Sequence, residues 1–355
     1  MFPALNVGAL VLGILILYVG AEFLIRGSAG IARAFGVKPL VVGLTVVAYG
    51  TSAPELAVAT KTALAGHTPI ALGTVIGSCA ANISLILGIT ALISPPTVDG
   101  RIIRREVPVL VGSAIAVPIL FRNGVLSRLE GALLVACAVV FTIATLTVAA
   151  RLDPDAIDQD DDEDDSDDSP ASSSIRPSRS NMRAATADRV AGQKSGAELG
   201  GQGRPRASKL RSSLMTGVGL VLLVAGSNFF VRGGRGIAGE LGMSERMLGL
   251  TVIAIGTALP ELIGSIVAAT RGHSALAVGS VIGSNLLNVF LVLGVTACLQ
   301  PIRLGERMHV VDLVGLVIIT LLGVVMLRGS RKITRLEGAL LVAAYIAFIV
   351  CAALL

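Results

Sequence analysis

Long apolar runs separated by short polar connections make up almost the whole chain. A membrane-spanning helix needs about 20 predominantly apolar residues, and most of the runs reach that length. The runs are Val7–Ile25, Pro39–Ala59, Ala71–Ile93, Val107–Phe121, Leu129–Ala150, Leu214–Val231, Met247–Ala269, Ala275–Leu299, Val310–Leu327 and Leu336–Leu355. The pattern therefore predicts an all-α polytopic membrane protein with ten transmembrane helices.

The composition agrees with a chain that folds in a bilayer. Hydrophobic residues make up 53% and charged residues only 15%, whereas soluble domains carry about 25% charged residues. The first apolar run continues through Gly20 and Glu22 without a small-residue cleavage pattern, so we expect a transmembrane helix rather than a cleaved signal. The net charge of +5 comes with arginines in the connections between spans, which favours membrane topology over nucleic-acid binding.

The second half of the chain repeats the first. GLTV at 43–46 recurs at 249–252 and GS at 77–78 recurs at 283–284, both at an offset of 206, while RLEGALLVA at 128–136 recurs at 335–343. Each half holds five apolar runs, and an odd number makes the second half enter the membrane from the opposite side. The sequence therefore predicts two inverted five-helix repeats, an arrangement found in secondary transporters that bind their substrates near the midplane.

The predicted repeats cover residues 1–150 and 212–355 and are joined by a polar segment at 151–211. This segment begins with an acidic run and continues with Ser, Arg, Gly and Gln, so it has too few apolar residues to fold and is interpreted as a disordered linker. Weak Ca2+ sensing by the acidic run is the alternative, although no fixed ligand spacing is present.

The basic residues of the connections predict the orientation. One set of connections, which includes the linker, holds about twice as many Lys and Arg residues as the other, and such residues are enriched on the cytoplasmic side. We therefore expect a multi-pass protein of the cell membrane with both termini outside and the linker in the cytoplasm.

Two glutamates lie in the middle of apolar runs, Glu55 after Pro54 and Glu261 after Pro260. Burying an ionisable side chain in a membrane costs several kcal/mol by most estimates, so such residues are functional candidates. Proline lacks an N–H donor and clashes with the preceding turn, which predicts a kink or break in both helices. The breaks are expected around Gly50–Thr51 and Gly256–Thr257, where they would release carbonyls beside Ala48 and Ala254.

Further oxygen-bearing side chains share helix faces with these acids. Residues four positions apart lie on one face of a helix, which groups the following sets: Thr51, Ser52 and Glu55; Thr257 and Glu261; Ser78 and Asn82; Ser284 and Asn288. Carboxylate, hydroxyl, amide and carbonyl oxygens are ligands suited to Ca2+ or Na+ rather than to Zn2+ or Cu2+. Ser, Thr and Asn also serve as packing residues between membrane helices, but packing gives no reason to bury an acid twice at equivalent positions.

Other polar residues of the spans have simpler interpretations. His67 and His273 each follow a glycine at a predicted span end, which favours an interfacial cap over a ligand. Glu22, Glu106 and Asp312 lie near span ends, where their side chains are expected to reach water.

The paired motifs resemble a known family. GTSAPE with GSCAAN, and GTALPE with GSNLLN, are similar to the α-repeats of the calcium/cation antiporter superfamily, especially of the prokaryotic sodium/calcium exchangers, here at 43–93 and 249–299. The resemblance implies ten helices in two inverted repeats and a central Ca2+ site of Glu55 and Glu261, with the carbonyls of Thr51 and Thr257. It also implies flanking Na+ sites and a completed centre, formed by Ser52, Ser78, Ser284, the carbonyls of Ala48 and Ala254, Asn82 and Asn288.

The chain departs from the family pattern at a few positions. Ala258 stands where many members have a serine, which removes a hydroxyl from an expected Na+ site, and Asn288 stands where many have an aspartate. Cys79 replaces a usual asparagine and is interpreted as a packing change. These differences leave both the Na+ stoichiometry and the identity of the counter-ion open.

Two facing carboxylates repel each other in a low-dielectric site, and Ca2+ would neutralise both, whereas Na+ or protons would do so one charge at a time. We therefore expect Na+/Ca2+ antiport, with Ca2+/H+ antiport as the alternative, by a monomer whose only ions are its substrates. Sliding of the first and sixth spans, which have glycine-rich stretches at Gly20–Gly30 and Gly226–Gly236, would supply alternating access.

Other function classes have less support. An intramembrane metal-dependent enzyme would be expected to carry HExxH, GxSxG or an aspartate-rich pair within a span, and the sequence contains none of them. A passive channel would need an open hydrated path, which buried half-sites in inverted repeats do not suggest. The prediction is a transporter without enzymatic activity or cofactor.

Overall fold

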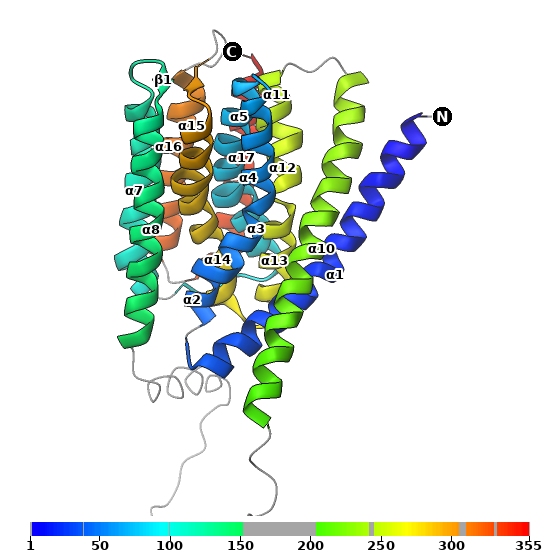
Figure 1. Cartoon of the computed structure of the whole chain (residues 1–355), viewed down its shortest axis with the longest axis vertical. Helices are drawn as coiled ribbons and strands as arrows, with labels where there is room; N and C mark the ends of the chain where they lie inside the picture. The colour runs from blue at the N-terminus through cyan, green and yellow to red at the C-terminus, as the bar shows by residue number, and fades with distance from the viewer. Residues whose placement is uncertain are drawn as a thin grey trace, which may run out of the picture.

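The computed structural model describes residues 2–37, 39–98, 100–151, 204–240, 245–304, 310–329 and 332–354, and these are almost entirely helical (Figure 1). The first half consists of α1 (Phe2–Phe35), α2 (Pro39–Val42), the π-helical turn η1 (Gly43–Val47), α3 (Ala48–Thr51), α4 (Ala53–Leu64), α5 (Thr68–Ala80), the π-helical turn η2 (Ala81–Ile86), α6 (Leu87–Ile93), α7 (Gly100–Leu120), strand β1 (Val125–Leu126) and α8 (Arg128–Arg151). The second half consists of α10 (Arg204–Glu240), α11 (Glu245–Leu248), η4 (Gly249–Ile253), α12 (Ala254–Thr257), α13 (Leu259–Thr270), α14 (Ser274–Leu287), η5 (Asn288–Leu293), α15 (Gly294–Leu299), strand β2 (Ile302–Arg303), α16 (Val310–Gly329) and α17 (Arg335–Leu354).

Several of these elements follow one another directly and form continuous rods. Within the described residues, eight helices are long and apolar enough to cross a membrane, and the bent pair at 249–270 makes a ninth. The remaining rod, α7, carries Arg104, Arg105 and Glu106 within its first two turns, and these charges interrupt its apolar stretch. The all-α polytopic fold predicted from the apolar runs is confirmed.

Contacts that recur between the two halves show the inverted repeat directly. An added Cβ on Gly88 of α6 would lie 2.7 Å from the Gly338 carbonyl oxygen of α17. The equivalent contact joins α8 to α15, where an added Cβ on Gly131 would lie 2.7 Å from the Gly294 carbonyl oxygen. Glycine at these positions lets the backbones of the two halves touch. The two contacts are equivalent, because in one α6 of the first half meets α17 of the second, and in the other α15 of the second half meets α8 of the first.

The short β contacts obey the same pseudo-twofold symmetry. Val125 of β1 pairs antiparallel with Arg303 of β2. A single bridge joins Thr97 to Lys332, and these positions are equivalent to Arg303 and Val125 respectively. Two equivalent β contacts therefore join the backbones of the two repeats.

The repeated RLEGALLVA segments begin helices with the same local chemistry. The backbone N–H of Ser127 donates to Glu130 Oε2 at 2.8 Å, and the Glu130 N–H donates to the Ser127 hydroxyl at 3.3 Å. Thr334 and Glu337 make the equivalent pair of hydrogen bonds at the start of α17, at 2.7 and 3.3 Å. This reciprocal arrangement is a capping box, which satisfies N–H groups that a helix start leaves without intrahelical partners.

Helices α1 and α10 cross each other at one side of the bundle formed by the other helices (Figure 1). An added Cβ on Gly13 of α1 would lie 2.9 Å from the Gly226 carbonyl oxygen of α10, and one on Gly20 would lie 2.9 Å from the Leu223 nitrogen. Both chain ends lie near one end of the molecule, and α10 begins at the opposite end (Figure 1). Glycines of both helices therefore let α1 and α10 pack with their backbones in contact.

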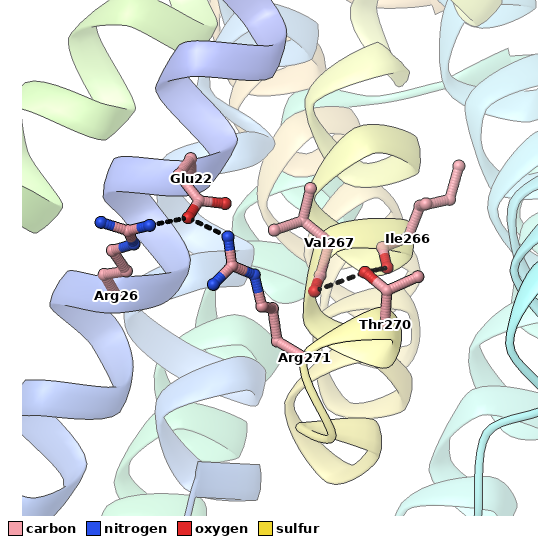
Figure 2. A network of polar contacts seen from close by, with 6 residues as sticks. All are labelled: Glu22, Arg26, Ile266, Val267, Thr270 and Arg271. Carbon is pink, nitrogen blue, oxygen red and sulfur yellow. Dashed lines mark hydrogen bonds and ion pairs between the residues drawn. The ribbon is translucent and has the colours of Figure 1, made fainter.

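The interpretation of three acidic residues as water-exposed span ends is also corrected. Glu106 is only 5% exposed and Asp312 is fully buried, because both face the packed interior of the bundle. One carboxylate oxygen of Glu22 on α1 pairs with Arg26 of the same helix and with Arg271 at the end of α13, each at 2.5 Å (Figure 2). A protein partner, rather than water alone, therefore holds the Glu22 charge.

Candidate cation site

The two Glu-Pro segments interrupt their helices as the prolines predict. Ser52, with φ of −78° and ψ of −1°, separates α3 from α4, and Ala258, with φ of −85° and ψ of 1°, separates α12 from α13. The second rod bends by 46° at this break. Pro54 and Pro260 lie in the first turns of α4 and α13, where a missing N–H removes no helical hydrogen bond. The interruptions therefore follow the predicted Gly-Thr pairs directly.

The carbonyls beside the breaks keep a backbone partner. The N–H of Ser52 donates to the Ala48 oxygen, and the N–H of Ala258 donates to the Ala254 oxygen, both at 3.0 Å. The prediction that the breaks release carbonyls is therefore wrong for these two oxygens. Since a carbonyl oxygen has two lone pairs, each retains one acceptor position.

Glu55 and Glu261 are fully buried, one at the start of α4 and one at the start of α13. Their carboxyl groups lie near each other across the boundary between the two halves. None of their four carboxylate oxygens has a hydrogen-bond partner within the described part of the chain. Two unpartnered carboxyl groups in one buried place bring together oxygens that a cation could bind.

Hydroxyl groups from both halves surround this centre. Glu55 faces the hydroxyls of Thr257 and Ser78, whereas Glu261 faces those of Thr51 and Ser284. None of these hydroxyls reaches a carboxylate oxygen with hydrogen-bond geometry. Each acid is therefore flanked by one hydroxyl from its own repeat and one from the other repeat.

The hydroxyls are held by contacts across the repeat boundary. Thr51 Oγ1 lies 3.4 Å from Ser284 Oγ, and Ser78 Oγ lies 3.5 Å from Thr257 Oγ1. Ser78 Oγ also donates to the Ala254 carbonyl at 3.4 Å. The Thr51 and Thr257 hydroxyls also donate to the Val47 and Ile253 carbonyls of their own helices at 3.0 Å, so the lone pairs of their oxygens remain available to a cation.

Three further polar side chains lie buried without partners near the breaks. Asn82 and Asn288 are fully buried and begin the π-helical turns η2 and η5. Neither their amide groups nor the Ser52 hydroxyl has a hydrogen-bond partner among the described residues. An unsatisfied buried polar group costs about 1–3 kcal/mol, so this concentration of unpartnered polar atoms indicates a site that a ligand completes.

Close helix contacts hold the hydroxyls at the breaks. Gly77 precedes Ser78, and an added Cβ there would lie 2.6 Å from both the Leu250 carbonyl oxygen and the Ala254 Cβ. At the equivalent position of the other repeat, an added Cβ on Gly283 would lie 2.8 Å from the Ala48 Cβ. The Gly-Ser pairs that recur at 77–78 and 283–284 as a sign of the repeat therefore also mark the close contacts that hold the two serines.

The remaining candidates lie outside the carboxylate pair. Cys79 Sγ points to the Asn285 carbonyl at 3.9 Å, which agrees with a packing role. The backbones of His67 and His273 accept N–H groups at the starts of α5 and α14, as expected for helix caps. Among the described residues, no group of three or more His, Cys, Asp or Glu side chains could hold a metal ion. The site therefore consists of two acids with neutral oxygen donors.

Comparison with known proteins assigns this arrangement to a family. The family model described as "Sodium/calcium exchanger protein" matches residues 5–147 and 212–354, which cover both repeats and leave out the linker. The chain belongs to this family. It is therefore a multi-pass membrane cation antiporter of the calcium/cation antiporter superfamily, and it is not an enzyme.

Individual relatives support the assignment. The putative antiporter CaxA of Alkalimonas amylolytica is 31% identical over 341 residues, which cover 95% of both chains. The sodium/calcium exchanger MaX1 of Methanosarcina acetivorans is 34% identical over 128 residues, which cover 36% of this chain and 37% of MaX1. A solved structure of the sodium-calcium exchanger NCX_Mj, soaked with Na+ and Ca2+, superimposes with a TM-score of 0.73 at 29% identity and covers 98% of both chains. The match with NCX_Mj supports the inverted-repeat fold over the whole chain.

Proposed function

We propose that this antiporter exchanges Ca2+ for Na+ across the cell membrane, with Ca2+ leaving the cell as Na+ enters. The observation that carries the proposal is the pair of buried acids, Glu55 and Glu261, whose carboxylate oxygens have no hydrogen-bond partner among the described residues. Two carboxylates match the charge of one Ca2+, and carboxylate, hydroxyl and carbonyl oxygens are its preferred ligands. The names of MaX1 and NCX_Mj as sodium/calcium exchangers support the same substrates.

Competition for the same charges accounts for exchange. In this proposal Ca2+ binds between Glu55 and Glu261, together with the carbonyls of Thr51 and Thr257. Na+ ions bind to the flanking oxygens of Ser52, Ser78, Ser284, Ala48 and Ala254, with Asn82 and Asn288 completing the centre. Since either set of cations neutralises the two acids, the site holds one set at a time, and the empty site with two bare charges is unfavourable in a low-dielectric interior.

Alternating access requires the site to open to each side in turn. We propose that α1 and α10 move together across the bundle, because their glycines bring the two backbones into contact over several turns. Gly27 extends this contact, since an added Cβ there would lie 2.5 Å from the Thr216 nitrogen. A pair packed in this way moves as one unit more readily than as two separate helices.

The proposed topology places both termini outside and the linker at 151–211 in the cytoplasm, between the repeats at 1–150 and 212–355. The positions of the two chain ends near one end of the molecule and of the α10 start at the other end support this arrangement (Figure 1). We further propose that the protein functions as a monomer, because each chain carries both acids of the site.

Ca2+/H+ exchange is the second candidate, and one position favours it. Ser52 supplies a buried hydroxyl beside the first break, but the equivalent position holds Ala258, which is buried and carries no oxygen. One Na+ ligand is thus absent from the second repeat. A proton needs no such shell of ligands, because it binds a carboxylate oxygen directly.

Vesicles that contain the purified protein distinguish the two candidates. With Na+ inside and none outside, Na+/Ca2+ exchange predicts rapid uptake of radioactive Ca2+, which stops when the Na+ gradient is removed. A pH gradient imposed at equal Na+ concentrations should give little uptake. Uptake driven by the pH gradient alone would contradict Na+ coupling and establish the proton alternative.

Restoring the absent hydroxyl is expected to strengthen Na+ dependence. In the variant Ala258→Ser, the added oxygen would lie at the position equivalent to Ser52 and should lower the Na+ concentration for half-maximal exchange roughly fivefold. The measurement is the initial rate of Ca2+ uptake as a function of Na+ concentration. Ser52→Ala is the matched control and should shift the half-maximal concentration in the opposite direction; an unchanged Na+ dependence in both variants would argue against flanking Na+ sites.

A further inference from the structure

Three arginines gather in one pocket between α1, α10 and the turn that joins α13 to α14. The pocket has a volume of about 530 Å3 and is lined by Arg26, Ala29, Gly30, Arg33, Ala34, Arg211, Ser212, Met215 and His273. It contains none of the residues of the candidate cation site. Pockets of this size accommodate small organic ligands and headgroups.

The electrostatics of this pocket favour an anion. None of its lining residues is acidic. Arg33 and Arg211 form no ion pair with another described residue, whereas Arg26 pairs with Glu22 (Figure 2). The guanidinium group binds phosphate through paired N–H donors and is more weakly hydrated than an ammonium group. The pocket therefore offers two guanidinium groups and the Ser212 hydroxyl to a phosphate.

The helix geometry explains why these arginines converge. Arg26 and Arg33 are seven positions apart and lie on one face of α1, with Gly30 between them. The Ser212 side chain of α10 occupies the space that a side chain at Gly30 would need. The close crossing therefore brings Arg211, next to Ser212, toward the arginine face of α1.

An apolar hollow adjoins the basic pocket on α10. It has a volume of about 410 Å3 and is lined by Ser213, Leu214, Gly217, Val218, Val221 and Leu222. Leu214 and Val221 are 65% and 69% exposed, and an added Cβ on Gly217 would meet no atom within 4 Å. Arg211 lies three positions before Leu214, so the hollow begins about one helical turn from the basic pocket.

A basic pocket beside an apolar hollow suits a ligand with an anionic head and an apolar tail. We propose that these two hollows form a binding site for an anionic phospholipid, whose phosphate lies between Arg33 and Arg211 and whose acyl chain lies along α10 beside Gly217. The site lies where the span of α1 ends at Ala34 and that of α10 begins at Lys209, which is the depth of a lipid headgroup. Basic pockets between membrane helices recognise anionic headgroups in this way.

The position of the site connects the lipid to the helices that are proposed to move. The phosphate contacts both α1 and α10, and Arg26 links its pocket to Glu22 and thereby to Arg271 of the core (Figure 2). A lipid bound there would hold the crossing of α1 and α10 together at the membrane boundary. The binding itself does not depend on which ion drives exchange.

Titration of the delipidated full chain in detergent, followed by native mass spectrometry, tests the proposal. The probes are phosphatidylglycerol, phosphatidylcholine and inorganic phosphate. Phosphatidylglycerol should bind most tightly, and the double variant Arg33→Gln with Arg211→Gln should weaken that binding roughly 25-fold. Gly217→Leu fills the apolar hollow without changing the charge and should also weaken phosphatidylglycerol binding.

The matched control is Arg122→Gln with Arg303→Gln, which removes two exposed arginines at the β1 and β2 end of the molecule. This control should bind phosphatidylglycerol as the unmodified chain does. The proposal is overturned if the control loses as much binding as the pocket variant, or if inorganic phosphate or phosphatidylcholine binds as tightly as phosphatidylglycerol. If phosphatidylglycerol binds only after residues 153–168 are deleted, that acidic segment rather than a lipid occupies the pocket in the full chain, and the proposal is likewise overturned.

Discussion

Replacing either Glu55 or Glu261 with Gln is expected to lower the initial rate of Ca2+ uptake by about 100-fold or more. Gln keeps the shape of the side chain but removes one of the two charges that match Ca2+. Removing one partner from a set of buried charges costs about 3–5 kcal/mol, which corresponds to a factor of more than 100 in affinity. Uptake of radioactive Ca2+ into vesicles loaded with Na+ measures the effect.

Thermal unfolding separates loss of the site from loss of the fold. A ligand that binds only the folded state stabilises it by mass action, so Ca2+ should raise the Tm of the unmodified protein and leave that of both Gln variants unchanged. Without Ca2+, the variants should be at least as stable as the unmodified protein, because each loses a buried carboxylate that has no hydrogen-bond partner in the described structure. Glu106→Gln is the control, since Glu106 is also a buried acid but lies on α7, outside the site. Continued exchange in both site variants would disprove the proposed role of the acids.

Much of the fold could be predicted because a membrane constrains sequence strongly. Apolar runs of nearly 20 residues predicted the helical rods, and the odd number of runs per half predicted the inverted repeat. The acids at Glu55 and Glu261 were identifiable for the same reason, because few side chains cost more to bury in a bilayer. Their pseudo-symmetric positions indicated that they meet, and the structure brings them together.

Other features depend on contacts that no local pattern reveals. The apolar runs do not show which face of a helix points inward, so Glu106 and Asp312 were expected to reach water and are in fact buried. The ion pair between Glu22 and Arg271 joins residues 249 positions apart. The π-helical turns that begin at Ala81 and Asn288 likewise have no local sequence signature. Each of them comes directly after a buried helix in the chain, α5 or α14.

The positions of the helix breaks show how local chemistry and packing combine. The prolines predicted that both helices are interrupted, which is confirmed. They did not predict that the N–H groups of Ser52 and Ala258 would keep the Ala48 and Ala254 carbonyls in helical hydrogen bonds. The helical hydrogen bonds therefore continue past Thr51 and Thr257, and only Ser52 and Ala258 lie outside the helices.

Substitution of Gly77 by Ala is expected to destabilise the protein by about 1–3 kcal/mol, which is the usual cost of overpacking. The added Cβ would lie 2.6 Å from the Leu250 carbonyl oxygen, so α5 and the η4 segment of the other repeat would have to move apart. This loss should exceed the gain of about 1 kcal/mol that Ala offers over Gly within a helix. Gly283→Ala, with its Cβ 2.8 Å from the Ala48 Cβ, should give a similar decrease, measured as the free energy of unfolding in detergent.

Gly112→Ala distinguishes steric contact from a general effect of replacing glycine. Gly112 lies within α7, where an added Cβ meets no atom within 4 Å, so this variant should be as stable as the unmodified protein or slightly more stable. A second comparison separates packing from ion binding, because Ser78→Ala removes the hydroxyl while leaving the glycine contact intact. If Gly77→Ala weakens Ca2+-dependent stabilisation as Ser78→Ala does, the close contact serves to place that hydroxyl at the site. If Gly77→Ala lowers stability while the Ca2+ effect persists, the contact holds the repeats together without positioning a ligand.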